Sequence, residues 1–324
     1  MASAPSAPSA QSRLRHVLSA FGPAIGLFFA CALFAGLRWQ TFMSVDNFAI
    51  MLQQTAVIGA GAIGMTVVIV AGGIDLAVGS TVALVTVAIA LLLKEQVSPL
   101  LAALGGVGLG GVCGLLTGTL VTRLGLTPFI VTLGLMGALR GAAKGLASEQ
   151  PIYPDETWLN GLMKLRDNGA PPIGVWITLA LAVVVALMLR YTRFGRHVFA
   201  IGSNEQTARL CGVPIERQKI LIYVVGGLFA GVAAVLQFAY LTGGDPTTSV
   251  GLELNVIAAV IIGGASLSGG QGTVLGSLIG ALIMSVVANG CTKLGMPNWV
   301  QEIVTGGIIV AAVLLDQLRR RGRS

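Results

Sequence analysis

Long runs of apolar residues, separated by short polar segments, recur along the chain from about residue 21 to residue 315. A helix that crosses a bilayer needs about 20 predominantly apolar residues. The pattern predicts ten spans, at about residues 20–37, 48–71, 76–93, 99–121, 128–146, 174–189, 220–241, 254–262, 273–288 and 300–315. We therefore predict an all-α, polytopic membrane protein with about ten transmembrane helices.

Composition supports this class. Hydrophobic residues make up 55% of the 324-residue chain and charged residues only 10%, whereas an average soluble domain is about 25% charged. A soluble core cannot bury so many apolar residues. We predict a disordered cytoplasmic tail at residues 1–19, a transmembrane domain at 20–318 that contains a cytoplasmic loop at 190–219, and a basic cytoplasmic tail at 319–324.

The positions of the charges predict an orientation. The net charge of +7 could suggest a nucleic-acid partner, but the basic residues cluster in the loops and at the termini. With the N-terminus inside, thirteen Lys and Arg residues face the cytoplasm and six face outward. Because cytoplasmic loops of membrane proteins are enriched in Lys and Arg, we predict an N-in, C-in topology and no nucleic-acid partner.

The polar stretch at residues 190–219 separates two predicted spans and carries six basic residues. Within it, Ser203 or Asn204 is a good N-cap and Glu205 favours a first helical turn. Gly212 fits the position just after a helix end, and Pro214 prevents continuation. We predict a short helix over residues 205–211. Such a helix is either a docking element for a partner or a turn in a solvated loop.

The faces of this short helix have different characters. Glu205 and Arg209 are four residues apart, so they can form an ion pair. Ala208 and Gly212 lie on a neighbouring face, and their small size allows close approach to a cleft in a partner. If the helix is a docking element, Ala208→Trp should block the partner by bulk.

Two glycine-rich stretches interrupt the apolar pattern, at residues 71–80 and 263–272. Gly72-Gly73 and Gly263-Gly264 follow Val- and Ile-rich runs, and an offset of 191 residues suggests a duplicated unit. Glycine-interrupted segments in both halves are a pointer to a transport pathway, and Asp75 adds a carboxylate in apolar surroundings. The alternative is a pair of tight turns at the cytoplasmic surface, with Asp75 as a helix N-cap.

Other chemistry is sparse. The four cysteines are widely separated and the two histidines have no Cys, Asp or Ser partner at informative spacing, so we predict no metal site and no disulfide framework. An integral-membrane enzyme would need a cluster of His, Asp or Glu near one membrane face. We predict no catalytic residues.

Three motifs together carry a family resemblance: VIVAGGIDLAVGS at residues 68–80, FGRHVFAIGSNEQTARLCGVP at 194–214 and VIAAVIIGGASLSGGQGT at 256–273. The chain resembles the membrane permease of bacterial ABC importers of the ribose/simple-sugar type. That family belongs to a larger group that includes branched-chain amino-acid permeases. The resemblance covers the chain from about the second span to the tenth.

The resemblance implies an inner-membrane, multi-pass permease that forms the pathway for a monosaccharide. Its implied partners are a second permease subunit (a copy or a close paralogue), a cytoplasmic ATPase and a periplasmic sugar-binding protein. The chain would bind no cofactor, since ATP and Mg are used by the ATPase. The implied coupling helix falls on Asn204, Glu205, Ala208, Arg209 and Gly212.

The substrate and the energy source stay open at this point. Asn255, Thr132, Gln53 and Gln54 are polar residues on apolar segments, and they either match sugar hydroxyls or join helices to one another. The alternatives are an ABC permease for branched-chain amino acids or nucleosides, and a secondary transporter driven by an ion gradient. The last of these should contain several intramembrane carboxylates, whereas Asp75 is nearly alone.

Overall fold

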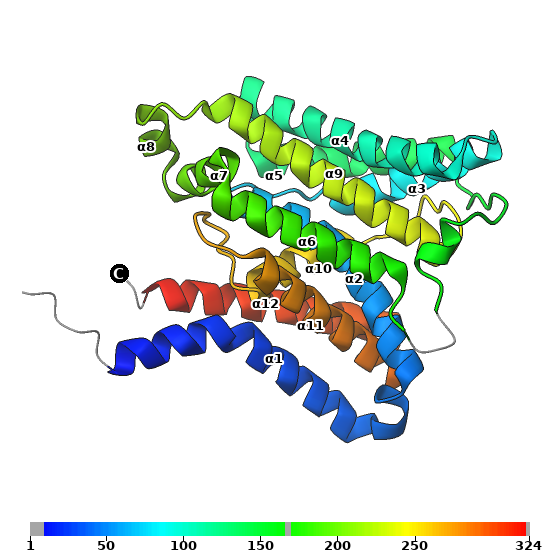
Figure 1. The fold of residues 1–324 in the computed structure, drawn as a ribbon, viewed down its shortest axis with the longest axis horizontal. Helices are drawn as coiled ribbons and strands as arrows, with labels where there is room; N and C mark the ends of the chain where they lie inside the picture. Colours follow the sequence, from blue (N-terminus) through cyan, green and yellow to red (C-terminus); the bar gives the residue numbers. More distant parts are fainter. Residues whose placement is uncertain (1–9, 166–169, 322–324) are drawn as a thin grey trace, which may run out of the picture.

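The computed structural model describes residues 10–165 and 170–321. Within these ranges the chain is helical, with an isolated β-bridge between Ile152 and Gly244 and no strand. The long helices run side by side (Figure 1). In chain order the elements are α1 (Ala10–Phe42), α2 (Val45–Val70), α3 (Val78–Lys94), α4 (Pro99–Arg123), α5 (Pro128–Leu146), η1 (Asn160–Leu162), α6 (Ile173–Tyr191), α7 (Arg193–Ser203), α8 (Glu205–Leu210), α9 (Ile215–Leu241), α10 (Leu252–Ile262), α11 (Val274–Lys293) and α12 (Asn298–Arg321).

Among the described residues, seven helices are long and apolar enough to cross a membrane: α1 (its Gly22–Phe42 part), α2, α4, α5, α6, α9 and α11. α3, α10 and the Asn298–Leu314 part of α12 are apolar but shorter. α10 has 11 residues, so it rises about 16 Å, roughly half the thickness of the hydrocarbon layer. The all-α prediction is confirmed for the described ranges, and the length criterion supports seven of the ten predicted spans.

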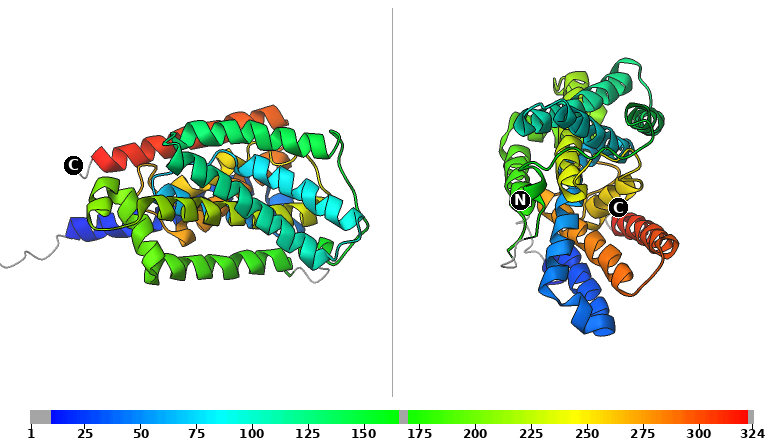
Figure 2. Two further views of the ribbon diagram at one scale, coloured as in Figure 1. Left: turned by 90° about the horizontal axis from the view of Figure 1, so that it is seen from above. Right: turned by 90° about the vertical axis from the view of Figure 1, so that its right-hand side faces the viewer.

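Helix α2 forms the centre of the bundle. It is buried along most of its length, and it packs against α9, α11, α10 and α6 (Figure 2). Small residues make this close packing possible. A methyl group on Gly64 of α2 would lie 2.6 Å from Cβ of Phe229 on α9, so the two helix backbones approach because Gly64 has no side chain.

The α4–α9 pair is packed in the same way. Gly110, Gly114 and Gly118 follow one another at four-residue spacing and share one face of α4. A Cβ on Gly118 would lie 2.9 Å from Cα of Ile220 on α9, and a Cβ on Gly114 would meet the carbonyl of Tyr223. The small-residue seam therefore brings the backbones of α4 and α9 into contact, as in many membrane helix pairs.

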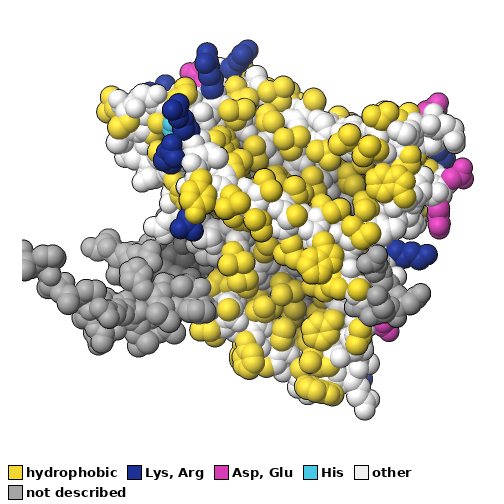
Figure 3. All heavy atoms as spheres, viewed as in Figure 1, with side chains coloured by type: hydrophobic (Ala, Val, Ile, Leu, Met, Phe, Trp, Pro, Cys, Tyr) yellow, Lys and Arg dark blue, Asp and Glu magenta, His cyan; other side chains and the backbone are white. Residues whose placement is uncertain are grey.

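The surface shows the expected partition of residue types. Hydrophobic side chains cover the middle of the face seen in Figure 3, while Lys and Arg gather at the end with α7 and α8 and several Asp and Glu lie at the other end. Large apolar side chains such as Phe28, Trp176 and Val183 are exposed. A water-soluble monomer rarely exposes so large an apolar area, whereas a membrane protein turns it to lipid.

Several boundaries differ from the sequence prediction. α1 begins at Ala10, well before the predicted boundary at residue 20, and residues 1–9 and 322–324 lie outside the described residues. α9 begins at Ile215 because Pro214 directly precedes it, five residues before the predicted span. The polar segment after α5 is partly folded inward, since Leu159 and Met163 around η1 are buried.

Candidate functional site

The turn after α2 ends that helix with a glycine in the left-handed conformation. Gly72 has φ +81°. Its amide donates to the carbonyl of Ile69 at 2.8 Å, and the Gly73 amide donates to that of Val68 at 2.9 Å. This is the Schellman arrangement, which satisfies helix carbonyls that would otherwise have no donor.

Asp75 follows in the same turn. Its carboxylate is 5% exposed and accepts a hydrogen bond from the amide of Ala77 at 2.8 Å. Ala77 occupies the N-cap position of α3 and has no side-chain cap. Asp75 is therefore buried inside the protein, and its hydrogen bond stabilises the start of α3 from two residues upstream of the N-cap.

The turn after α10 has the same form. Gly264 has φ +91°, its amide donates to Ile261 at 2.9 Å, and the Ala265 amide donates to Val260 at 3.1 Å. Gly264 is thus the structural counterpart of Gly72. The sequence analysis paired Gly72 with Gly263 instead, so the observed pairing differs from the predicted one by one residue. The likeness is confined to the helix endings, because α2 and α10 differ greatly in length.

The two turns meet at a place that we call the glycine junction, formed by Val70, Gly72, Gly202, Gly269 and Gly270. The Gly270 amide donates to the carbonyl of Val70 at 2.8 Å. Gly202, near the end of α7, lies against both segments. A Cβ there would overlap the Val70 carbonyl and lie 2.6 Å from the Gly270 nitrogen. The three motifs of the sequence analysis therefore touch one another through their backbones.

Helix α7 is an element that the sequence analysis missed. Thr192 caps it by accepting a hydrogen bond from the Gly195 amide at 3.2 Å. Val198 and Ile201 are buried while Arg193 and Arg196 are exposed. The residues RFGRHVFAIGS thus form an amphipathic helix. The spacing of basic and apolar residues in this segment is typical of an amphipathic helix and could have predicted α7. It was missed because so many basic residues close together are typical of a loop.

Helix α8 confirms the predicted short helix to within one residue. The Asn204 side chain accepts a hydrogen bond from the Thr207 amide at 2.9 Å, which is the predicted N-cap. Gly212 has φ +82°, and Val213 donates to the Ala208 carbonyl at 3.1 Å. The helix end predicted at Gly212 is therefore also present, in the same Schellman form as at Gly72.

The charges on α8 are arranged differently from the prediction. The Glu205–Arg209 pair exists at 3.7 Å, but both side chains are largely exposed, so the pair contributes little. The shorter contact joins Glu205 to Lys219 of α9 at 2.7 Å, with the lysine side chain 27% exposed. Glu205 thus ties α8 to α9, a contact across 14 residues that helical spacing could not reveal.

The predicted orientation of Ala208 is wrong. Ala208 is 4% exposed and faces its own chain, whereas Leu210 is 89% exposed. A tryptophan at position 208 would disturb the packing of α8 on its own chain, so that variant does not test docking. The large apolar residue that this helix exposes is Leu210, which lies on a basic surface.

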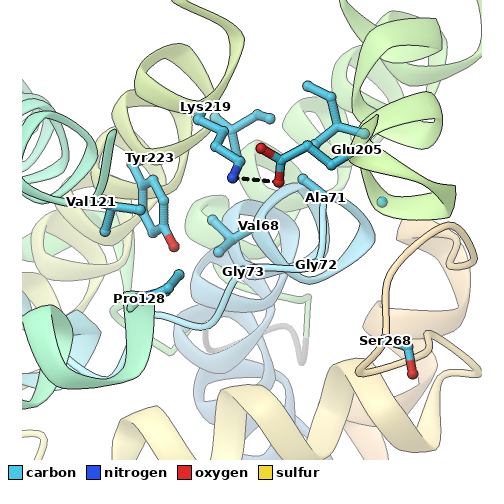
Figure 4. A pocket seen from close by; sticks show the side chains of 13 residues that line it. Val68, Ala71, Gly72, Gly73, Val121, Pro128, Glu205, Lys219, Tyr223 and Ser268 are labelled. Atoms are coloured by element: carbon cyan, nitrogen blue, oxygen red, sulfur yellow. Dashed lines mark hydrogen bonds and ion pairs between the residues drawn. The ribbon is translucent and has the colours of Figure 1, made fainter. Parts of the chain in front are cut away.

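A cavity of about 150 Å³ lies beside the junction, between the turn after α2, α8 and α9 (Figure 4). The Glu205–Lys219 pair lines it on one side, and Tyr223 lines it on the other. The Tyr223 hydroxyl is buried and has no hydrogen-bond partner among the described residues.

The remaining predicted pathway residues lie elsewhere. Thr132 is buried in α5, where its hydroxyl donates to the carbonyl of Pro128 at 2.9 Å. Asn255 is half-buried in the first turns of α10. Gln53 is buried on α2, and its amide donates to the carbonyl of Met163. None of these three side chains lines the cavity beside the glycine junction.

Comparison with known proteins shows the family of the chain. Residues 47–313 match the family described as "Branched-chain amino acid transport system / permease component". The chain belongs to this family. The match covers the glycine junction, α8 and every long helix except α1. No solved structure gives a significant match.

Three similar proteins are named as permeases for sugars. The chain is 38% identical to the ribose import permease protein RbsC of Escherichia coli K12 over 86% of its own length and 88% of the relative's. It is 37% identical to the L-arabinose ABC transporter permease protein AraH of Azospirillum brasilense, over 87% of its own length and 83% of the relative's. It is 33% identical to the D-allose transport system permease protein AlsC of E. coli K12, over 89% of its own length and 88% of the relative's. The chain is therefore a multi-pass protein of the cell membrane.

The junction generates the first test. Gly202→Ala places a methyl group where the Val70 carbonyl and the Gly270 nitrogen already lie, so the turns must separate. We expect a loss of about 1–3 kcal/mol in unfolding free energy and roughly tenfold slower uptake at a given expression level. Thermal unfolding of the purified permease and uptake in cells measure the two effects.

The matched control is Gly36→Ala in α1, where a Cβ would have no neighbour within 4 Å. Because alanine favours helix over glycine by about 1 kcal/mol, this variant should be as stable as wild type or more so, and should transport normally. Wild-type unfolding and wild-type uptake in Gly202→Ala would show that the junction tolerates a side chain.

Proposed function

We propose that this chain is the membrane permease subunit of an ABC importer that takes up a monosaccharide. The observation that carries the proposal is family membership combined with 33–38% identity, over most of the chain, to ribose, arabinose and allose permeases. In this proposal a separate cytoplasmic ATPase supplies the energy and an extracytoplasmic binding protein delivers the sugar. The permease contributes the pathway and no catalytic group.

The proposed topology has ten membrane crossings with both ends in the cytoplasm. The start of α1, the end of α12 and the basic helices α7 and α8 all lie at one end of the bundle (Figure 1). That end carries most of the dark-blue side chains seen in Figure 3, in accord with the enrichment of Lys and Arg in cytoplasmic loops. The shorter helices α3 and α10 complete their crossings with the loops that adjoin them.

The proposed coupling helix is α8. Its Leu210 is 89% exposed, and burying this apolar side chain in a pocket of the partner would be favourable. The Glu205–Lys219 pair and the glycine junction connect α8 to α9 and, through α7, to the turn after α2. Closure of the ATPase would then move these elements together as a rigid body.

In this proposal the junction lies at the cytoplasmic end of the pathway. Gly72, Gly73, Gly263 and Gly264 end the two helices there, and Asp75 fixes the chain between Gly73 and α3. Of the polar candidates, Asn255 is better placed than Thr132 to meet a sugar, because the Thr132 hydroxyl is already bonded within α5.

The proposed second permease subunit packs against α5. Gly134, Gly137, Gly141 and Gly145 are exposed, and a Cβ at each would have no neighbour within 4 Å. Three of them follow one another at four-residue spacing, the arrangement that lets two membrane helices approach closely. Since a two-fold axis brings the same surface of each subunit together, a copy of this chain suits the face.

Measuring which energy source drives uptake tests the proposal directly. In membrane vesicles with the ATPase and the binding protein present, uptake of ribose, arabinose or allose should require ATP and persist after an uncoupler collapses the ion gradient. Leucine and a nucleoside serve as competing substrates. Uptake that stops with the uncoupler and continues without the ATPase would contradict the proposal, and uptake of leucine alone would contradict the sugar assignment.

Two variants separate docking from coupling. Leu210→Asp places a charge where an apolar anchor should be buried, so we expect the ATPase no longer to co-purify with the permease. Lys219→Gln removes the contact from α8 to α9 and leaves Leu210 in place, so the ATPase should still bind while uptake falls several-fold.

Cys211→Ser is the matched control, because Cys211 is an exposed neighbour at the end of the same helix. It should retain both ATPase binding and uptake. Membrane insertion of all three variants is checked by fractionation. Wild-type recovery of the ATPase with Leu210→Asp would remove α8 from the interface.

Oxidative cross-linking tests the α5 interface. In a Cys211→Ser background, Gly141→Cys should form a disulfide-linked dimer in the membrane, because residues near a two-fold axis meet their own copies. Val183→Cys on α6, which is exposed on the opposite face of the bundle (Figure 2), should stay monomeric on a non-reducing gel. The reverse result would place the second subunit on α6.

A further inference from the structure

A second cavity lies at the end of the bundle opposite α7 and α8. It has a volume of about 440 Å³ and lies between α2, the segment around η1 and the end of α9. The side chains that matter for its chemistry are Gln53, Glu156, Trp158, Asn160, Lys164 and Tyr240. Its size is that of a site for a small organic group.

The cavity lies at the level where the spans leave the apolar layer. α9 ends at Leu241, next to Tyr240, and α6 begins at Ile173. Trp158 is 55% exposed, and Trp176 in the first turn of α6 is 58% exposed. Trp and Tyr concentrate at the boundary between hydrocarbon and water. These residues put the cavity at the depth of the headgroup region.

The lining carries one charge of each sign, Glu156 and Lys164. Within the described ranges the ion pairs all involve Glu205, so Glu156 and Lys164 have no ionic partner there. Asn160 accepts a hydrogen bond from the Thr157 amide at 2.8 Å through Oδ1, which leaves its NH₂ group as a donor. The site thus offers a cation and an amide donor for an anion, and a carboxylate for a cation.

We infer that this cavity binds the headgroup of a zwitterionic phospholipid. Lys164 and Asn160 would hold the phosphate, and Glu156 would hold the ammonium group. The acyl chains would lie along α6, which packs against η1 and whose residues Ile173, Leu179 and Val183 are exposed. A monosaccharide fits less well, because it has no charge to pair with Glu156 or Lys164.

The experiment uses delipidated wild-type permease in detergent. Phosphatidylethanolamine, phosphatidylcholine or phosphatidylglycerol of the same acyl composition is added, and bound lipid is counted by native mass spectrometry alongside thermal unfolding. We expect the two zwitterionic lipids to bind and stabilise more strongly than the anionic one. Lys164→Gln should lower the affinity for phosphatidylethanolamine about fivefold, which corresponds to ~1 kcal/mol.

Two variants control for charge and for folding. Lys94→Gln removes an exposed lysine at the same end of the bundle, outside the cavity, and should bind like wild type. Lys164→Arg keeps the positive charge and should retain the preference for zwitterionic lipid. The inference is overturned if phosphatidylglycerol binds best, if Lys164→Gln and Lys94→Gln behave alike, or if ribose stabilises the protein and phospholipid does not.

Discussion

The structure depends on a contact between backbones at the glycine junction. Gly202 of α7 lies against the Val70 carbonyl and the Gly269–Gly270 segment, at a distance that excludes any side chain. The Gly270 amide completes the contact by donating to Val70. Since backbone atoms have few rotational alternatives, a contact of this kind fixes the relative position of the three segments more tightly than one between long side chains would.

Glycine serves two distinct physical purposes in this protein. Gly72, Gly212 and Gly264 have positive φ and end three helices in the same Schellman form. These positions need glycine for its conformational freedom. Gly114 and Gly202, by contrast, are inside helices and need glycine because another backbone lies against them. The first group sets where helices stop, and the second sets how closely they pack.

Glu205 forms one ion pair within its own helix and one with a neighbouring helix, and the two differ in strength. Glu205 has two basic neighbours, and the one at helical spacing, Arg209, is the weaker partner because both side chains are exposed. Lys219 is more enclosed and its contact is shorter, at 2.7 Å. The larger contribution therefore comes from the pair that joins two helices, which makes Glu205 a fixed point between a surface helix and the bundle.

Sequence alone determined the all-α membrane class, the short helix with Asn204 and Gly212 at its ends, and the family resemblance, because these follow from apolar run length, capping chemistry and local motifs. It did not reveal α7, the inward orientation of Ala208, the Glu205–Lys219 pair or the meeting of the two glycine turns at Gly202. Helix ends are local, since each is fixed by hydrogen bonds among a few neighbouring residues. Which glycine meets which carbonyl depends on how helices distant in sequence cross, and only the packed bundle decides that.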